Sequence, residues 1–210
     1  MKAKEERNLR IMIAVPCYQA CEPDTMKSIY DLMIPAGVET SLVFVTGYTV
    51  VQARNRIVEK SLKDNYDYTL FVDSDVVLPN NLLERLLSLG ADIACGWYVK
   101  KIPGTQEKIA EIYTLRFDGQ NIRNVLESEM PKEGVLEIAA CGFGCALVRN
   151  TLFVKVYDGM YFEYIERKQG SGTFIMSEDI YFCGKSKAMA QAKILLDTSL
   201  RCPHIGKAAF

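Results

Sequence analysis

Neither sign of charge is in excess in this sequence, which has 25 lysine and arginine residues, 26 aspartate and glutamate residues and a formal net charge of −1. A protein that binds a nucleic-acid backbone usually carries a basic stripe, so we expect no nucleic-acid partner. No apolar run approaches the roughly 20 residues that span a bilayer. The charged start, MKAKEERNLR, leads into an apolar segment too short for the core of a signal peptide. We therefore expect a cytoplasmic protein without a transmembrane segment.

Metal-binding cysteine motifs are missing as well. The seven cysteines include two CxxxC pairs, Cys17/Cys21 and Cys141/Cys145, but no CxxC and no spacing of a zinc site. Scattered cysteines in odd number are more typical of buried free thiols in a reducing compartment. Linkers, repeats and low-complexity tracts are also absent, so we predict one domain over residues 1–210.

Apolar segments typical of buried strands alternate with segments of helical period in the first hundred residues. The pattern predicts strands at 10–15, 41–46, 68–72 and 91–96, and helices at 24–34, 49–64 and 79–89. Thr49 is a plausible cap for the second helix. Such alternation indicates right-handed crossovers and a mostly parallel sheet covered on both faces, hence an α/β fold.

The pattern becomes mixed after residue 100. Segments 111–117 and 121–126 flank Asp118-Gly119, which predicts a hairpin. The remaining expected elements are strands at 135–140, 161–165, 194–196 and 200–202, and helices that begin near residues 150 and 178. We expect a small mixed second half on the same domain.

Two acids follow the third predicted strand directly, in Asp73-Ser74-Asp75. Ligands of open α/β sheets collect at the carboxyl ends of strands. Two neighbouring carboxylates there are costly unless a positive group neutralises them, and Mg²⁺ or Mn²⁺ does so while sharing its other positions with a diphosphate. The alternative is two acids in an ordinary strand-ending turn, where aspartate is common.

Two further features bear on this choice. His204 is the only histidine, and a neutral imidazole is a good additional ligand for Mn²⁺. Glu178 and Asp179 follow Ser177 at the start of a predicted helix, where one of them could remove a proton from a hydroxyl. Helix capping by serine and the helix dipole explain the same three residues without any catalysis.

These segments together resemble the GT-A glycosyltransferases, especially the family 2-like group, in the same order along nearly the whole chain. The matching segments are 13–18 (IAVPCY) at the opening strand, Asp73-Ser74-Asp75 at the D-x-D metal motif, Gly142-Phe143-Gly144 at the acceptor-side strand, Ser177-Glu178-Asp179 at the E-D motif and His204-Ile205-Gly206 at the closing strand. The resemblance implies the GT-A fold, a Rossmann-like, mostly parallel sheet flanked by helices. Residues 1–100 would then bind the nucleotide-sugar and residues 101–210 would form the acceptor side.

The resemblance also implies a reaction, the transfer of a sugar from a nucleotide-diphosphate sugar, with UDP favoured, to an acceptor hydroxyl with inversion. Asp75 and His204 would bind Mn²⁺ or Mg²⁺, and Asp73 would contact the ribose or a metal-bound water. Asp179 would be the general base, and Glu178 would position the acceptor. The cation would neutralise the departing diphosphate.

The remaining donor-side residues implied by the resemblance are Pro16, Tyr18, Arg54, Asn55 and Ser74. Arg54-Asn55 resembles an A-R-N element that contacts the nucleotide in some relatives, although a solvated helix face explains it equally well. Tyr18 could stack on the base or could be a core tyrosine. Gln19 departs from the asparagine that the family often has at that position.

The acceptor side is the least defined part of the sequence. Trp97 and Gly142-Phe143-Gly144 are the residues expected there. Trp97-Tyr98 could form a platform for a sugar, and the alternative is a buried aromatic pair. Residues from about 103 to 134 hold the expected acceptor-side variation. The acceptor could be a glycan, a glycoprotein or a lipid-linked molecule, and the chain could be one part of a larger multidomain enzyme.

Two other functions stay open. Asp73-Ser74-Asp75-Val76-Val77 also fits the nucleophile motif of haloacid-dehalogenase-type phosphatases, with Asp73 as nucleophile, but that motif normally lies on the first strand. A non-catalytic nucleotide-sugar-binding module is the other alternative. A sugar-phosphate nucleotidyltransferase is disfavoured, because no glycine-rich phosphate loop follows the first strand.

Overall fold

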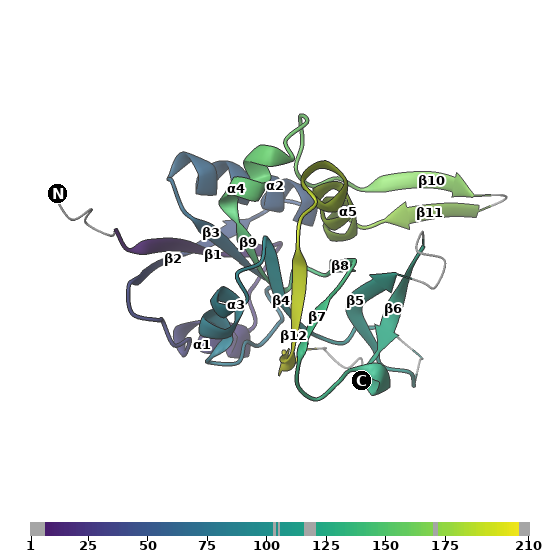
Figure 1. Ribbon diagram of the computed structural model, residues 1–210, viewed down its shortest axis with the longest axis horizontal. Coiled ribbons are helices and arrows are strands. Elements are labelled where there is room, and N and C mark those ends of the chain that lie inside the picture. Colours follow the sequence, from purple (N-terminus) through teal and green to yellow (C-terminus); the bar gives the residue numbers. More distant parts are fainter. Residues whose placement is uncertain (1–6, 103, 105, 116–120, 170–171, 206–210) are drawn as a thin grey trace.

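A seven-stranded sheet forms the centre of the computed structural model, which describes residues 7–102, 104, 106–115, 121–169 and 172–205 (Figure 1). The strand order is β2-β1-β3-β9-β4-β12-β7. The bounds are β1 Leu9–Cys17, β2 Val38–Thr46, β3 Tyr68–Val72, β4 Ile93–Trp97, β7 Val135–Glu137, β9 Cys145–Arg149 and β12 Ile194–Arg201. Only β7 and β9 run against the other five strands. The predicted mostly parallel α/β sheet is thus confirmed.

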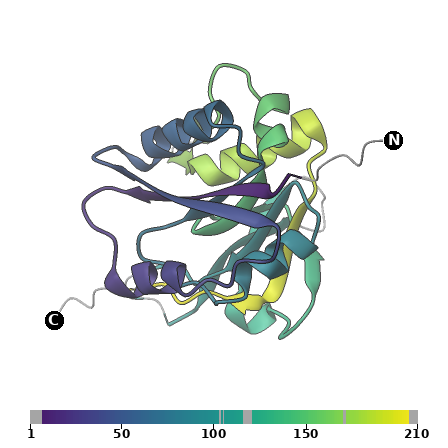
Figure 2. The same ribbon diagram turned by 90° about the vertical axis from the view of Figure 1, so that its left-hand side faces the viewer.

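Helices cover both faces of this sheet (Figures 1 and 2). On one face lie α2 (Val50–Lys63), α4 (Asn150–Lys155) and α5 (Glu178–Ala190), and on the other lie α1 (Pro23–Tyr30) and α3 (Leu82–Ser88). Alternate residues of a strand point to opposite faces. Accordingly Met12 of β1 packs into the core under α2, whereas Ile11 and Ile13 pack into the core under α1 and α3.

Local sequence explains the helix that matters most for the site, α2. The side chains of Thr49 and Gln52 exchange hydrogen bonds with each other's backbone N–H groups, a capping box that confirms Thr49 as the cap. Ile57 and Val58 are fully buried against the sheet. The helix is therefore fixed both at its first turn and along its inner face.

Five phenylalanines pack together beneath the end of β3. The cluster consists of Phe71, Phe143, Phe153, Phe162 and Phe182, all with no exposed surface. The closest pair, Phe162 and Phe182, stacks with ring centroids 4.7 Å apart. Replacing one such buried ring with alanine typically lowers the free energy of unfolding by about 3–5 kcal/mol. The cluster therefore stabilises the packing of α4 and α5 on the central sheet.

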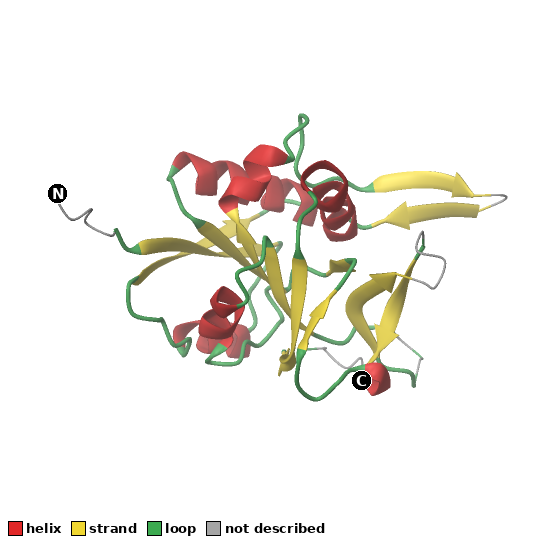
Figure 3. Cartoon of the chain, in the orientation of Figure 1, coloured by secondary structure: helices red, strands yellow, loops and turns green. Residues whose placement is uncertain are grey.

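The second half contains two small sheets in addition to its part of the central one (Figure 3). Strands β5 (Ile109–Leu115), β6 (Ile122–Leu126) and β8 (Ala140–Cys141) form one sheet, and a short 3₁₀ helix, η1 (Glu127–Glu129), follows β6. The two strands of the predicted hairpin are confirmed, while its Asp118-Gly119 turn lies outside the described residues. Strands β10 (Ile165–Gln169) and β11 (Gly172–Met176) form a second, antiparallel pair that the sequence pattern did not predict.

Three of the predicted strands, 161–165, 194–196 and 200–202, differ from the observed ones. Residues 161–164 form an irregular loop rather than a strand, because the Asn55 carboxamide oxygen accepts the backbone N–H groups of Tyr161 and Phe162, both at 3.1 Å. The two closing strands are one strand, β12, with an irregular pairing between Leu196 and Arg201. None of the helices in the described part of the chain is long and apolar enough to cross a membrane.

Candidate active site

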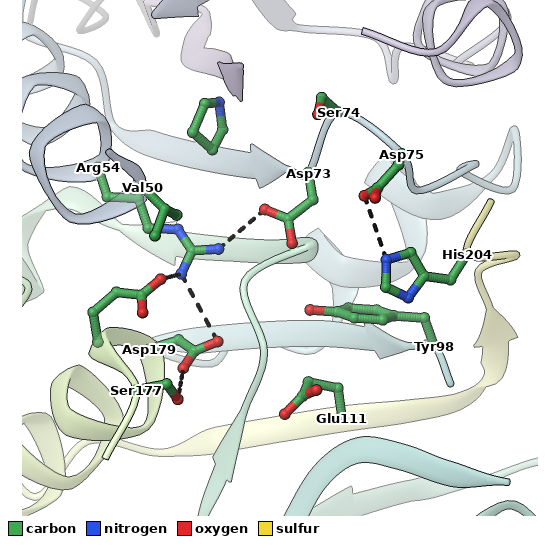
Figure 4. A pocket seen from close by; sticks show the side chains of 12 residues that line it. Val50, Arg54, Asp73, Ser74, Asp75, Tyr98, Glu111, Ser177, Asp179 and His204 are labelled. Atoms are coloured by element: carbon green, nitrogen blue, oxygen red, sulfur yellow. Dashed lines mark hydrogen bonds and ion pairs between the residues drawn. The ribbon is translucent and has the colours of Figure 1, made fainter. Parts of the chain in front are cut away.

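A cavity of about 330 Å³ lies at the carboxyl ends of β1 and β3, and Figure 4 shows the side chains around it. The segments that follow β3 and β4, the first turns of α2 and α5, and the segment after β12 all contribute to its wall. Its lining consists of Pro16, Val50, Arg54, Asp73, Ser74, Asp75, Tyr98, Glu111, Ser177, Glu178, Asp179 and His204. Five of these residues are acids, against one arginine and one histidine.

Arg54 is the cationic centre of one side of this cavity. Its side chain, only 3% exposed, donates hydrogen bonds to Asp73 Oδ1 at 3.0 Å and to Glu178 Oε1 at 2.5 Å. Asp179 Oδ2 lies 3.8 Å away. Burial alone would lower the pKa of Arg54, but the three carboxylates outweigh it and raise that pKa. Arg54 therefore joins acids from β3 and α5 to α2 as one charged group (Figure 4).

The three acids around Arg54 are held differently. Burial raises the pKa of both Asp73 and Glu178, and the Arg54 guanidinium partly offsets this. Asp179 accepts the Ser177 hydroxyl and the Ile180 N–H on Oδ1, at 2.5 and 2.8 Å. Its Oδ2 lies beyond hydrogen-bond distance of Arg54, so this oxygen is the one available to a ligand.

Asp75 and His204 form a second group on the opposite side. His204 Nε2 lies 3.4 Å from Asp75 Oδ1, and Nδ1 lies 2.8 Å from the Val99 carbonyl oxygen. A hydrogen on Nδ1 satisfies that carbonyl, which leaves Nε2 facing Asp75, as in histidines that bind metals. Lys101 also pairs with Asp75. Burial would raise the pKa of Asp75, but the hydrogen bonds from His204 and Lys101 lower it to about 2.

Backbone hydrogen bonds explain why His204 lies beside the turn after β3. Val77 N–H donates to the Pro203 carbonyl at 2.9 Å, and Ile205 N–H donates to the Asp75 carbonyl at 2.8 Å. Burial would lower the pKa of His204, but Asp75 and the Val99 carbonyl outweigh that effect and raise it. The C-terminal segment is thus fixed beside Asp75 by its own backbone.

The fit of a divalent cation to these residues follows from charge and donor type. Among the described residues, no group of three or more His, Cys, Asp or Glu side chains is arranged to hold a metal ion, and Asp73 is hydrogen-bonded to Arg54. Asp75 and His204 offer one oxygen and one nitrogen next to an acidic cavity. Mg²⁺ and Mn²⁺ accept few protein ligands and take the rest from water or phosphate, so these two residues fit such an ion.

The implied donor-side residues are not all at the cavity. Pro16 and Ser74 line it, whereas Tyr18 lies outside its lining and is 69% exposed. Asn55 lies outside as well, because its side chain donates to the Val51 and Phe162 carbonyls at 2.9 and 2.8 Å and so holds the loop after α4. The structure therefore gives Asn55 a structural position, and only Arg54 of the pair reaches the site.

The implied acceptor-side residues are buried behind the cavity. Trp97 donates its indole N–H to the Thr198 carbonyl at 2.8 Å, and Phe143 belongs to the phenylalanine cluster. A Cβ at Gly142 would lie 2.2 Å from the Tyr98 hydroxyl, and one at Gly144 would lie 2.7 Å from the Tyr98 ring. These four residues thus do not line the cavity, and both glycines are required for Tyr98 to pack where it does.

Tyr98 and Glu111 line the cavity as well. The Tyr98 hydroxyl accepts the Gly144 N–H at 3.1 Å, and the ring packs edge-on against His204 with centroids 5.1 Å apart. Glu111 pairs with Lys100 at 3.1 Å. Lys100 and Lys101 are thus both ion-paired, with Glu111 and Asp75 respectively. Trp97 and Tyr98 are both buried, as expected of the aromatic pair given as the alternative to a sugar platform, and Glu111 had no signal in the sequence.

Comparison with known proteins places this geometry in a wider context. No protein family and no curated protein sequence matches the chain. Among solved structures, A197 from STIV has a TM-score of 0.64 at 17% identity, covering 95% of this chain and 87% of that one. GalNAc-T7, solved with UDP, GalNAc and Mn²⁺, has a TM-score of 0.57 at 11% identity.

GalNAc-T7 has a GT-A fold, and the alignment with it covers 97% of this chain and 45% of that one. The chain has the GT-A fold. At these identities the likeness shows the fold alone. The GT-A sheet explains why the ends of β1, β3 and β12 lie at one cavity. The roles of the cavity residues are argued from their own contacts and charges.

Proposed function

We propose that this GT-A chain is a metal-dependent glycosyltransferase that moves a sugar from a nucleotide-diphosphate sugar to an acceptor hydroxyl. The observation that carries this proposal is the division of one cavity into two charged groups. Asp75 and His204 lie on one side, and the acids joined by Arg54 lie on the other. The Asp75 side could bind a cation together with a diphosphate, and the Arg54 side could supply a general base.

The donor would lie along the Asp75 side of the cavity. Asp75 and His204 would hold Mn²⁺ or Mg²⁺, which when bound supplies positive charge to the leaving diphosphate. Pro16 and Ser74 would contact the nucleoside, and Asp73 would contact the ribose. GalNAc-T7 was solved with UDP and Mn²⁺, which supports UDP as the first nucleotide to test.

The base would be Asp179. Ser177 and Ile180 hold its Oδ1, which leaves Oδ2 to accept a proton. In an inverting transfer, the acceptor oxygen bonds to the anomeric carbon while the bond to the diphosphate breaks. The hydroxyl proton passes to Asp179 Oδ2, which requires a reach of about 2.6–3.2 Å. Glu178, held by Arg54, would position the acceptor rather than take the proton.

The phosphatase alternative is less well supported, because Asp73 would be its nucleophile. One oxygen of Asp73 is engaged by the buried Arg54, and the pKa of the carboxyl is raised by burial. Both features lower its availability as an anionic nucleophile. A binding module without catalysis would keep the donor site, so turnover distinguishes it from an enzyme.

Calorimetric titration of UDP, GDP and dTDP in Mn²⁺ and then in EDTA tests the donor site. We expect one nucleotide to bind the wild type, with binding at least about 10-fold weaker in EDTA and in Asp75→Ala, since EDTA removes the cation and the substitution removes one of its two protein ligands. Asp24→Ala, an exposed acid on α1, is the matched control and should bind as the wild type does. Metal-independent binding, or no binding of any of the three, would contradict the proposal. In the latter case phosphatase activity on p-nitrophenyl phosphate is the next assay.

A further inference from the structure

A second cavity of about 540 Å³ lies beside the first and shares Glu111 and Ser177 with it. Strands β5, β6 and β11 and the start of α5 enclose it, on the side of the molecule where both hairpins lie (Figure 1). Its lining consists of Lys100, Glu111, Tyr113, Ile122, Arg123, Asn124, Ile175, Met176, Ser177 and Ile180. Its volume is in the range of small-molecule sites.

Both cations of the second cavity are already neutralised. Lys100 Nζ lies 3.1 Å from Glu111 Oε1 and donates to the Tyr113 hydroxyl at 2.7 Å. Arg123 donates to Glu129 Oε2 at 2.7 Å. A phosphate or carboxylate ligand would have to displace these acids, at the cost of leaving them unpaired. The charge pattern therefore favours a neutral ligand.

The apolar part of the second cavity is aliphatic. Ile122, Met176 and Ile180 line it together with Ile175, which is 58% exposed. Among the described lining residues the one aromatic ring is Tyr113, and its hydroxyl is already engaged by Lys100 and Glu111. The predominance of aliphatic side chains favours an alkyl chain as the ligand of this wall.

Glu111 connects the two cavities. Its Oε1 accepts the Tyr113 hydroxyl at 2.8 Å and pairs with Lys100, and the same carboxylate lines the first cavity together with Asp179. A carboxylate is an acceptor-only group that suits the hydroxyls of a neutral ligand. A ligand that extends from the second cavity to Asp179 would therefore contact Glu111.

We propose that the second cavity binds the acceptor, that the acceptor is a neutral hydroxyl compound with an alkyl chain, and that Glu111 accepts a hydrogen bond from it. This inference rests on the proposed glycosyltransferase function. The alkyl chain lies against the isoleucines, and the hydroxyl end extends past Glu111 to Asp179. The reaction at Asp179 is the transfer described above, with no further co-reactant.

The test compares hexyl β-D-glucoside with methyl β-D-glucoside as probes, by NMR titration of the full chain. We expect the hexyl compound to bind at least about 10-fold more tightly, because its extra methylenes leave water. Ile175→Ser should weaken hexyl binding about 3- to 10-fold and leave methyl binding unchanged. Val135→Ser, a half-exposed valine that lines neither cavity, is the matched control and should change neither.

Two further measurements test the role of Glu111 and the preference for a neutral ligand. Glu111→Gln should weaken both glucosides by a similar factor, since both present the same hydroxyls. Hexyl phosphate should bind no better than hexyl glucoside. A 10-fold preference for the phosphate, equal binding of the two glucosides, or transfer to a serine or threonine peptide but not to the hexyl compound would overturn the inference.

Nucleotide binding by the wild-type protein, measured beside the two glucosides, keeps this inference distinct from the proposed function. If UDP binds the wild type with Mn²⁺ but the wild type does not discriminate between the glucosides, the acceptor inference fails alone. If the hexyl compound binds as expected while no nucleotide binds, the proposed function fails and the second cavity is only a site for alkyl compounds, which also overturns its role as the acceptor site.

Discussion

At the scale of single residues, Arg54 carries the charge balance of the candidate active site. It is buried, and it contacts Asp73 and Glu178 directly with Asp179 close by. Removing one partner of a buried ion pair leaves an uncompensated charge, which costs far more than the loss of an exposed pair. Asp73 and Glu178 thus depend on one residue of α2 for charge compensation.

Arg54→Met should lower the free energy of unfolding by about 3–5 kcal/mol at neutral pH. Without Arg54 the buried acids become neutral only by taking up protons. The difference in free energy of unfolding between the variant and the wild type should therefore narrow as the pH falls towards about 5. Arg56→Met is the matched control, because Arg56 lies exposed on the same helix over the Tyr48 ring, 4.2 Å from its centroid. Urea unfolding measures both, and equal values for the two variants would contradict this role of Arg54.

The cysteines give a second residue-scale prediction. Burial raises the pKa of the half-buried Cys21 thiol to about 11, and the pKa of the buried Cys183 thiol is raised well above its ordinary value. The thiolate is the reactive form, so both should react slowly with iodoacetamide at neutral pH. Alkylation of Cys21, followed by mass spectrometry, should accelerate as the pH rises towards 11, while Cys183 stays unmodified until the protein unfolds. Rapid alkylation of native Cys21 at pH 7 would contradict this.

At the scale of elements, the packing of Tyr98 links the sheet to the site. The turn between β8 and β9 passes so close to Tyr98 that its two glycines have no room for a Cβ. The same ring packs against His204. A change at that turn should therefore affect His204 through one aromatic ring.

Gly144→Ala should lower the free energy of unfolding by about 1–3 kcal/mol, because its Cβ would lie 2.7 Å from the Tyr98 ring and force it to move. Gly184→Ala on α5 is the matched control. Apart from its chain neighbours and the backbone of its own helix, no atom lies within 4 Å of a Cβ built there, so the better helix propensity of alanine should raise stability by about 0.5–1 kcal/mol. Thermal unfolding measures both variants, and a change in the same direction for the two would count against this account of the turn.

Local sequence predicted the elements of the first half because buried strands and amphipathic helices alternate there. Tyr68–Val72 matched β3 to the residue, and Thr49 capped α2 as expected. The loop at 161–164 was missed because the Asn55 side chain, more than a hundred positions away, determines its backbone. No local pattern contains such a contact.

At the scale of the whole molecule, the fold brings together residues from both ends of the chain. The sequence predicted that Asp75 and His204 would meet, and the backbone pairing of Val77 with Pro203 explains how they do. Glu111 was not predicted as a site residue, because an acid that alternates with apolar residues along a strand is typical of a solvent-exposed position. Its place between two cavities depends on how the small sheet packs against the large one.

Turnover of a nucleotide-sugar tests the central claim most directly. We would measure the release of nucleoside diphosphate from UDP-, GDP- and dTDP-sugars in Mn²⁺ by wild type and Asp179→Asn. The account predicts turnover of one donor by the wild type, and a rate at least about 100-fold lower in the variant with nucleotide binding retained, since a general base is lost. Wild-type rates in Asp179→Asn, or nucleotide binding without any turnover by the wild type, would contradict it.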